Sequence, residues 1–265
     1  MNTDTASAIN TLGHFCGMRD VERLDREALA DRFGLDQADV FVLFGGSIVA
    51  GGDVLADAIR DRIARSFILV GGAGHTTETL RQTVHREYPE IRTAGLPEAE
   101  IFQQYLKHVH GCGADYLETE STNCGNNITC LLELIRRNRI PCRSIILCQD
   151  ATMQRRMDAG FRRYAPEGVT VINYASYQAK VEAAGKTLVY ADPIHGMWAV
   201  NRYVQLLMGE IPRLTDDGNG YGPKGRGFIA HVDIPGGVLD AFRALKSVYG
   251  EATRPANPRY ASGRT

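Results

Sequence analysis

The chain has 265 residues, of which 44% are hydrophobic and 23% charged, with a net charge of −1. This composition is typical of a soluble globular protein, and the near-neutral charge excludes a strongly basic protein of the kind that binds nucleic acid or an anionic membrane surface. The sequence shows neither a signal-peptide pattern nor an apolar run near the roughly 18 residues that a membrane span needs, so we expect a cytoplasmic protein.

Two weakly amphipathic helices are predicted within the first 35 residues, and we expect them to pack on a sheet. Five short and almost continuously apolar segments then predict buried strands. These strands are expected over residues 39–44, 67–70, 115–119, 144–148 and 169–173. Amphipathic patterns between the strands predict helices. One helix is expected to begin at about Asp53, and a second to run from the loop after the second strand to about Glu87. A third is expected over 97–109, and two more follow the third and fourth strands.

The alternation of apolar strands and amphipathic helices predicts a parallel sheet with helices on both faces. Right-handed crossovers place the loops that follow the strands along one edge of such a sheet. These loops are the glycine-bearing and polar segments of the chain. The sequence therefore predicts a ligand crevice at the carboxyl ends of the strands.

The alternation stops near Leu188. Helical patterns around 198–207 and 237–248 flank a stretch rich in glycine and aspartate, residues 212–227. We therefore expect residues 1–190 to form N-terminal helices and the α/β core, and residues 191–265 to form a small C-terminal helical appendage. His195 and Tyr221 are candidates for closing over the crevice, and a core position is favoured for Trp198.

The loop after the second strand is the strongest candidate for a ligand site. Its glycines let a ligand approach the backbone, and the first N–H groups of the next helix attract negative charge. The candidate residues are Gly71, Gly72, Gly74, His75, Thr76 and Thr77. His75 is also the candidate catalytic residue because histidine exchanges protons near neutral pH; the alternative is a histidine that only caps the turn.

The loop after the first strand, Gly45-Gly46-Ser47, is a weaker candidate for holding a phosphate or carboxylate. A plain turn is the alternative, because the chain lacks both the P-loop pattern and the dinucleotide-binding glycine pattern.

The densest polar cluster follows the third strand. Its candidate ligand-binding residues are Ser121, Thr122, Asn123 and Asn127. Such side chains suit ribose hydroxyls, amides or a carboxylate, whereas a helix cap would explain only one or two of them. The preceding Glu118 and Glu120 are candidates for a ribose diol or a positively charged group, with solvated surface as the alternative. Glu98, by contrast, is read as an acid in the first turn of a helix, where the dipole favours it.

The helix after the fourth strand opens with Asp150, Thr152 and Arg155. Arginine offers a bidentate fork to a carboxylate or phosphate, and the alternative is a helix cap followed by surface arginines. Metal ligation is not expected, because no metal-binding spacing of histidine, cysteine or acidic residues occurs. The six cysteines form no C-x-x-C pair, and we expect reduced thiols.

Together these loops resemble the bacterial YdcF-like family, which is related to the SanA and ElyC envelope proteins. The matching segments are Gly71–Thr77, Ser121–Gly125, Asp150 with Thr152–Arg156, and Pro212–Pro235. The resemblance implies a Rossmann-like core and binding of S-adenosyl-L-methionine; no reaction is established for the family. One departure is Asn126-Asn127, where the family usually has Glu-Asn, so that an acid is replaced by a side chain that cannot take up a proton.

We therefore expect a monomer or homodimer that binds a nucleotide-like small molecule at the carboxyl ends of the strands, with S-adenosyl-L-methionine as the cofactor. One alternative is a hydrolase or transferase that acts on a phosphorylated or envelope-precursor substrate. Another is a non-catalytic sensor that uses the same crevice.

Overall fold

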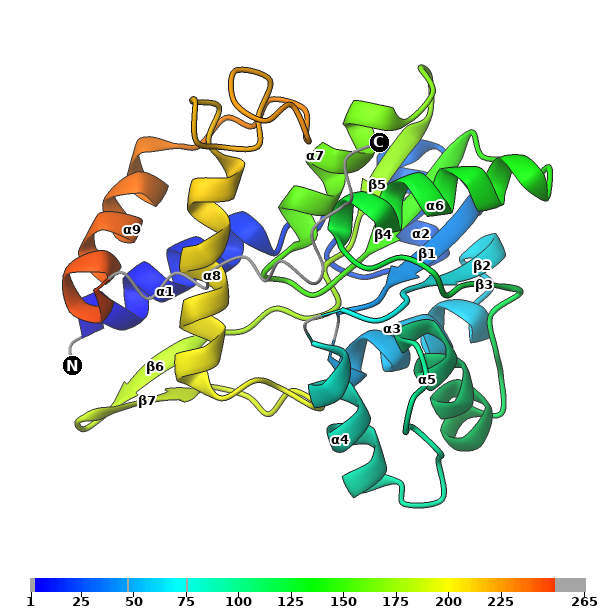
Figure 1. Ribbon diagram of the computed structural model, residues 1–265, viewed down its shortest axis with the longest axis horizontal. Coiled ribbons are helices and arrows are strands. Elements are labelled where there is room, and N and C mark those ends of the chain that lie inside the picture. Colours follow the sequence, from blue (N-terminus) through cyan, green and yellow to red (C-terminus); the bar gives the residue numbers. More distant parts are fainter. Residues whose placement is uncertain (1–2, 47, 75, 251–265) are drawn as a thin grey trace.

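A five-stranded parallel sheet forms the centre of the protein, which a computed structural model describes over residues 3–46, 48–74 and 76–250 (Figure 1). The strands are β1 (Ala38–Phe44), β2 (Ala64–Val70), β3 (Tyr116–Glu118), β4 (Ser144–Cys148) and β5 (Thr170–Asn173). All neighbouring pairs are parallel, in the order β3-β2-β1-β4-β5. This confirms the predicted α/β fold. The order reverses between β1 and β4, where ligands bind in open α/β sheets.

Helices cover both faces of the sheet. One face is covered by α2 (Arg26–Phe33), α3 (Val49–Arg60), α4 (Thr77–Glu87) and α5 (Glu98–Tyr105), which ends in the single π turn η1 (Leu106–His110). The other face is covered by α6 (Cys124–Arg137) and α7 (Gln154–Tyr164). The strand sequences are apolar on both sides because neither face meets water.

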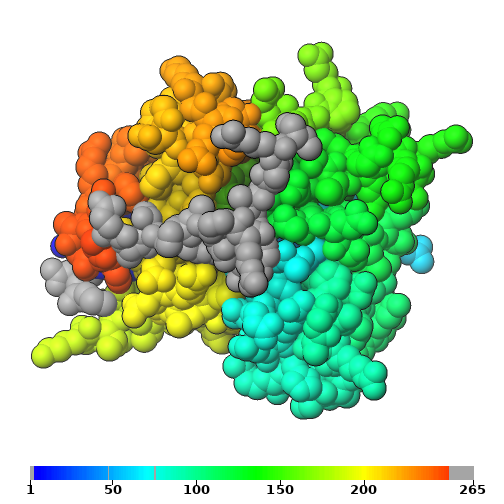
Figure 2. All heavy atoms as spheres, in the orientation of Figure 1, coloured from blue at the N-terminus to red at the C-terminus, as the bar shows by residue number. Residues whose placement is uncertain are grey.

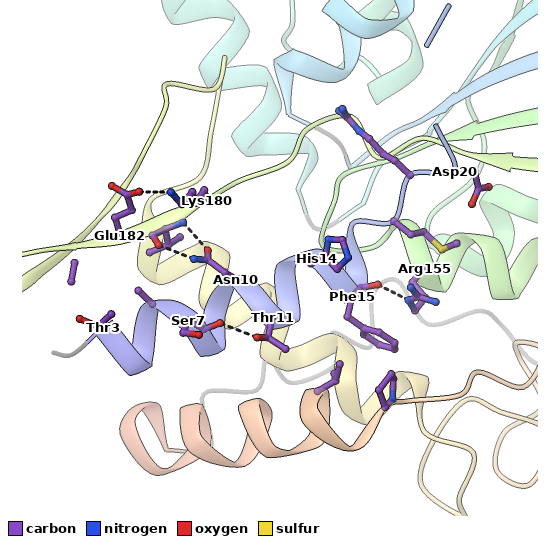
Figure 3. A pocket seen from close by; sticks show the side chains of 17 residues that line it. Thr3, Ser7, Asn10, Thr11, His14, Phe15, Asp20, Arg155, Lys180 and Glu182 are labelled. Atoms are coloured by element: carbon purple, nitrogen blue, oxygen red, sulfur yellow. Dashed lines mark hydrogen bonds and ion pairs between the residues drawn. The ribbon is translucent and has the colours of Figure 1, made fainter. Parts of the chain in front are cut away.

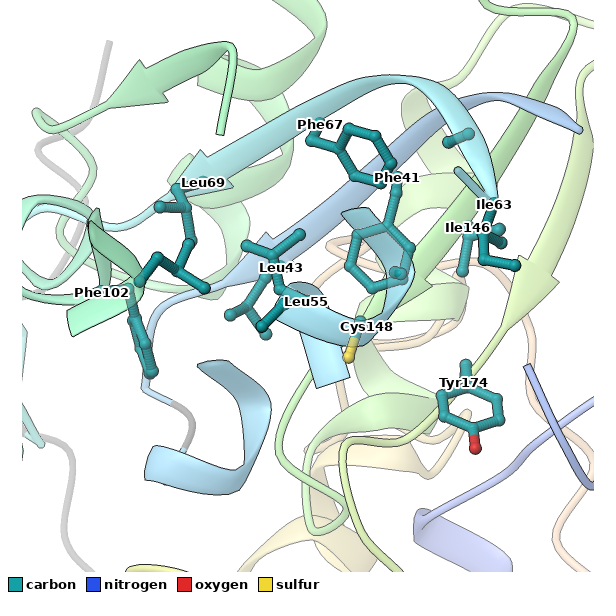
Figure 4. Close-up of a cluster of buried hydrophobic side chains, with 14 of the residues drawn as sticks. Phe41, Leu43, Leu55, Ile63, Phe67, Leu69, Phe102, Ile146, Cys148 and Tyr174 are labelled. Carbon is teal, nitrogen blue, oxygen red and sulfur yellow. The ribbon is translucent and has the colours of Figure 1, made fainter. Parts of the chain in front are cut away.

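Side chains of β1 alternate between the two layers of core, and all seven residues of this strand are buried. Phe41 and Leu43 point into the larger cluster, where Phe41 packs against Phe67 of β2 with ring centroids 6.2 Å apart (Figure 4). Val42 and Phe44 point into the cluster beneath α6 and α7. The sheet edge that carries the loops is thus anchored by close-packed core on both sides.

A second lobe lies beside the sheet in the ribbon view (Figure 1), and Figure 2 shows its outer surface. This lobe has its own hydrophobic core. It consists of α1 (Thr3–Cys16), the hairpin β6 (Val181–Ala184) and β7 (Thr187–Tyr190), α8 (Val200–Leu214) and α9 (Gly236–Tyr249). The sequence placed α1 on the sheet, but its buried residues belong to this second core. The lobe therefore draws on residues on both sides of the boundary expected at residue 190.

Helix α3 and one hairpin depart from the sequence prediction for physical reasons. Helix α3 begins at Val49 rather than near Asp53, because Gly51-Gly52 hides the helical pattern. A Cβ on Gly52 would lie 2.8 Å from the Tyr105 ring, so close packing of two helices requires this glycine. The antiparallel β6–β7 hairpin was not predicted, because its strands have only four residues each. Within the described ranges, no helix is long and apolar enough to cross a membrane.

Candidate functional site

The loops that follow β1, β2 and β3 meet at the carboxyl edge of the sheet. A Cβ on Gly45 would lie 3.0 Å from the Cα of Gly71, and one on Gly72 would lie 2.2 Å from the carbonyl oxygen of Ser121. A Cβ on Gly46 would lie 3.4 Å from Thr76 Oγ1. Glycine is required where these backbones touch. The structure therefore brings the predicted residues of three loops together.

Glu98, at the first position of α5, holds two of these loops in place. Its Oε1 accepts hydrogen bonds from Thr77 Oγ1 at 2.8 Å and Thr76 Oγ1 at 3.2 Å. The Gly46 backbone N–H also donates to this carboxyl group. Burial raises the pKa of Glu98 above its ordinary value, although the three hydrogen bonds oppose the shift. Only 5% of the residue is exposed.

This role of Glu98 was not predicted from the sequence. An acid in the first turn of a helix is usually explained by the helix dipole. The available signal was its position: Glu98 follows Pro97 directly and begins a helix whose other core-facing residues are apolar.

Asn123 caps α6. Its side-chain Oδ1 accepts from the backbone N–H groups of Gly125 and Asn126 at 3.0 and 3.1 Å. Thr122 Oγ1 and Asn123 Nδ2 both donate to Asn126 Oδ1. Ser121 Oγ accepts from the Gly72 N–H at 3.3 Å. Much of this polar cluster therefore builds the loop itself, as the capping alternative anticipated in part.

Two buried polar groups of this edge keep hydrogen-bonding capacity. Glu118 uses Oε1 to accept from the N–H groups of Glu120 and Ser121, at 2.7 and 2.9 Å. Its Oε2 is buried and has no partner in the described part of the chain. Asn127 is only 7% exposed, and its side-chain amide has no hydrogen bond to any described residue. Unpaired groups of this kind are costly unless a ligand or water completes them.

Three helix N-termini face this edge without a side-chain cap. The N-cap residues of α3, α4 and α7 are Ile48, Thr76 and Met153, and none of them makes a capping hydrogen bond through its side chain. In α3 the Ala50 N–H donates to the carbonyl oxygen of His195 instead. The uncapped N–H groups of α4 and α7 remain, and such groups at the positive end of a helix favour an anionic ligand group. Met153 also adjoins the first-strand loop, because a Cβ on Gly46 would lie 3.2 Å from its Cε.

Asp150 is the second residue after β4, and its carboxyl group is occupied by hydrogen bonds within the protein. Its Oδ1 accepts from the N–H and Oγ1 of Thr152, at 2.9 and 2.7 Å, and from the Tyr177 hydroxyl at 2.9 Å. Its Oδ2 accepts from Trp198 Nε1 at 3.0 Å. Burial raises the pKa of Asp150 despite these donors. The carboxyl group thereby joins the sheet to the second lobe, and Trp198 is buried as predicted.

Arg155 does not reach the meeting point of the three loops. Its Nε donates to the carbonyl oxygen of Phe15, and its guanidinium carbon lies 4.1 Å from the centre of the Phe15 ring. The next residue, Arg156, pairs with buried Glu210 of α8, with Nη2 3.0 Å from Oε1. Two further candidates, Ser47 and His75, lie outside the described residues.

Burial disfavours ionisation of two cysteines, Cys142 ahead of β4 and Cys148 at its end. All six cysteines are free. Burial raises the pKa of Cys142 to about 11 and that of Cys148 to about 12, so these thiols stay protonated at neutral pH. Across the described residues, no group of three or more histidine, cysteine, aspartate or glutamate side chains is arranged to hold a metal ion.

His195 connects the second lobe to α3 and α4. Its Nδ1 lies 2.7 Å from Asp53 Oδ2, and its Nε2 lies 2.8 Å from Glu87 Oε2. His110 Nε2 and the Tyr105 hydroxyl also contact Asp53, through Oδ1. Desolvation lowers the pKa of His195, but the hydrogen bonds to Asp53 and Glu87 outweigh it, so the pKa is raised above 6.5.

We expect this histidine to make folding stability depend on pH. The pKa of His195 in the folded protein exceeds the unfolded value of about 6.5. Its contribution to folding stability is therefore fully present below pH 6.5 and is lost as the pH rises through the folded pKa. As the pH rises from 6 to 8, the urea concentration at the midpoint of unfolding should therefore decrease, and it should decrease less in His195→Gln. The same fall in both proteins would contradict the assignment.

The comparison with known families adds no assignment, since no protein-family model matches the chain. The resemblance to the YdcF-like family therefore rests on the sequence segments quoted above. The geometry of the carboxyl edge stands without it, because it follows from the fold, the glycine contacts and the buried carboxyl groups.

Proposed function

We propose that the carboxyl edge of the sheet binds a nucleotide-like small molecule, with S-adenosyl-L-methionine as the first candidate. The observation that supports a ligand here most directly is Glu118 Oε2, a buried carboxylate oxygen with no hydrogen-bond partner among the described residues. The amide of Asn127, a residue that is 7% exposed, lies at the same edge. They belong to the end of β3 and the first turn of α6, directly beside the glycine loops. A hydroxyl-bearing ligand would supply the partners that they lack.

The residues present suit the parts of S-adenosyl-L-methionine. Ribose hydroxyls both donate and accept, which matches the carboxylate of Glu118 and the amide of Asn127. The amino-acid carboxylate is an anion, which matches the uncapped N-termini of α4 and α7. When bound, the cofactor would supply an electrophilic sulfonium group. The choice of this molecule over other nucleotide-like ligands rests on the family resemblance.

Calorimetric titration of S-adenosyl-L-methionine tests the proposal, with S-adenosylhomocysteine, ATP and NAD as comparisons. Asn127→Ala should weaken binding about three- to tenfold, since it removes one ligand hydrogen bond. The melting temperature should change little, because the Asn127 side chain bonds to no other described residue. Asn138→Ala, at the other end of α6, is the matched control and should bind as the unaltered protein does.

The outcomes separate the ligand from the site. Binding of ATP but not S-adenosyl-L-methionine, with the same loss in Asn127→Ala, would keep the site and replace the cofactor by a phosphorylated ligand. Equal affinity of Asn127→Ala and the unaltered protein for every ligand would contradict the site. Turnover assays with bound cofactor would then distinguish an enzyme from a sensor.

A further inference from the structure

A groove of about 1090 Å³ runs along the outer face of α1 in the second lobe (Figure 3). Ser7, Thr11 and His14 line its floor. Residues 180–183, which include most of β6, form one wall, and the start of α9 forms part of the other. Arg155 lies at one end, close to His14 and Phe15 in the view. Of the residues predicted to bind the cofactor, Arg155 alone is among those that line the groove.

Arg155 is oriented and makes no direct ion pair with a described carboxylate, although Asp158 and Asp20 act on its charge from further away. Its Nε is used by the Phe15 carbonyl oxygen and its plane packs on the Phe15 ring, which fixes the position of the guanidinium group. No carboxylate of the described chain forms an ion pair with it, and its Nη1 and Nη2 have no hydrogen-bond partner there. Two parallel N–H donors in a fixed plane are what a bidentate oxyanion requires.

The charges around the groove favour an anion. Arg19 also lines it, is held by the carbonyl oxygen of Ala175 and packs on Tyr174, again without an ion pair to the described residues. The acids are partly engaged: Glu182 pairs with Lys180 at 2.7 Å, and Asp20 accepts from Asn173. Burial lowers the pKa of both arginines, a destabilisation of their charge that a bound anion would relieve.

We propose that the Arg155 end of this groove is a second ligand site, separate from the carboxyl edge of the sheet, for a small molecule bearing a carboxylate or phosphate group. Arg155 binds the oxyanion through Nη1 and Nη2, and His14 contacts it from the adjoining turn of α1. The polar face of α1 extends from this point, so the rest of the ligand lies over Thr11 and Ser7.

Calorimetric titration with inorganic phosphate and, separately, with succinate tests the proposal and distinguishes the two oxyanions. At least one probe should bind saturably. Arg155→Gln should weaken that binding at least about tenfold, as loss of a charge-assisted bidentate contact does. His14→Gln should also weaken it, and this side chain is exposed, so the variant should fold normally. Arg137→Gln removes an equal charge at the exposed end of α6 and is the control.

Two results would overturn the inference. The first is that neither probe binds saturably at concentrations above the micromolar-to-millimolar range that is usual for small-molecule affinities. The second is that Arg155→Gln and His14→Gln leave probe binding unchanged. Asn127→Ala should bind the probe normally. A loss of probe binding in Asn127→Ala, with none in His14→Gln, would instead place the anion at the carboxyl edge and also overturn the inference.

Discussion

Replacing Asp150 by alanine is expected to destabilise the protein by at least about 3 kcal/mol, because several buried donors would lose their acceptor at once. The side chains concerned are those of Thr152, Tyr177 and Trp198, together with one backbone N–H. For a chain of this size, that loss corresponds to a fall in melting temperature of about 6–12 °C. Thermal unfolding followed by circular dichroism measures it.

The single tryptophan makes the same variant informative about the second lobe. Trp198 is 9% exposed and donates to Asp150, so its fluorescence should shift to longer wavelength in Asp150→Ala if the contact between lobe and sheet loosens. Asp192→Ala, an exposed aspartate near Trp198 in sequence, is the control and should leave both signals unchanged. A melting temperature within 2 °C of the unaltered protein would contradict a structural role for Asp150.

The central sheet could be predicted from sequence because each strand is short, apolar and bounded by polar loops. The fourth strand was predicted with its observed bounds, Ser144–Cys148. The partner of α1 could not be predicted, since an amphipathic helix shows only that it has a buried face. Its neighbours, α8 and α9, lie about two hundred residues further along the chain, and local patterns hold no information on such distant pairing.

Prediction of the candidate site was limited in a different way. The glycines at 45, 71 and 72 were selected because they would let a ligand approach the backbone, and the structure shows that contacts between the loops themselves require glycine there. Side-chain roles were less accessible, because hydrogen bonding depends on orientation. Arg155 is the second residue of α7, yet its guanidinium turns toward α1. Sequence position placed the backbone correctly and left the direction of the side chain open.

Glu98→Ala is expected to abolish measurable ligand binding at the carboxyl edge. The glutamate accepts hydrogen bonds from Thr76, Thr77 and the Gly46 N–H, which belong to two different loops. Its removal leaves these donors unpaired and takes away the contact that fixes the loops relative to each other. Unpaired buried donors cost about 1–3 kcal/mol each, and loops that reorder on binding reduce affinity further.

Titration of S-adenosyl-L-methionine and thermal unfolding, measured together, separate this role from simple loss of folding. Glu98→Gln keeps the volume and one acceptor oxygen, so it should bind with intermediate affinity. Glu100→Ala, in the same turn of α5, is the control and should bind normally. If Glu98→Ala binds as tightly as Glu100→Ala, the carboxyl group does not organise the site. If Glu98→Ala remains folded but does not bind, the two glycine loops act as one unit, and Glu98 is the residue that joins them.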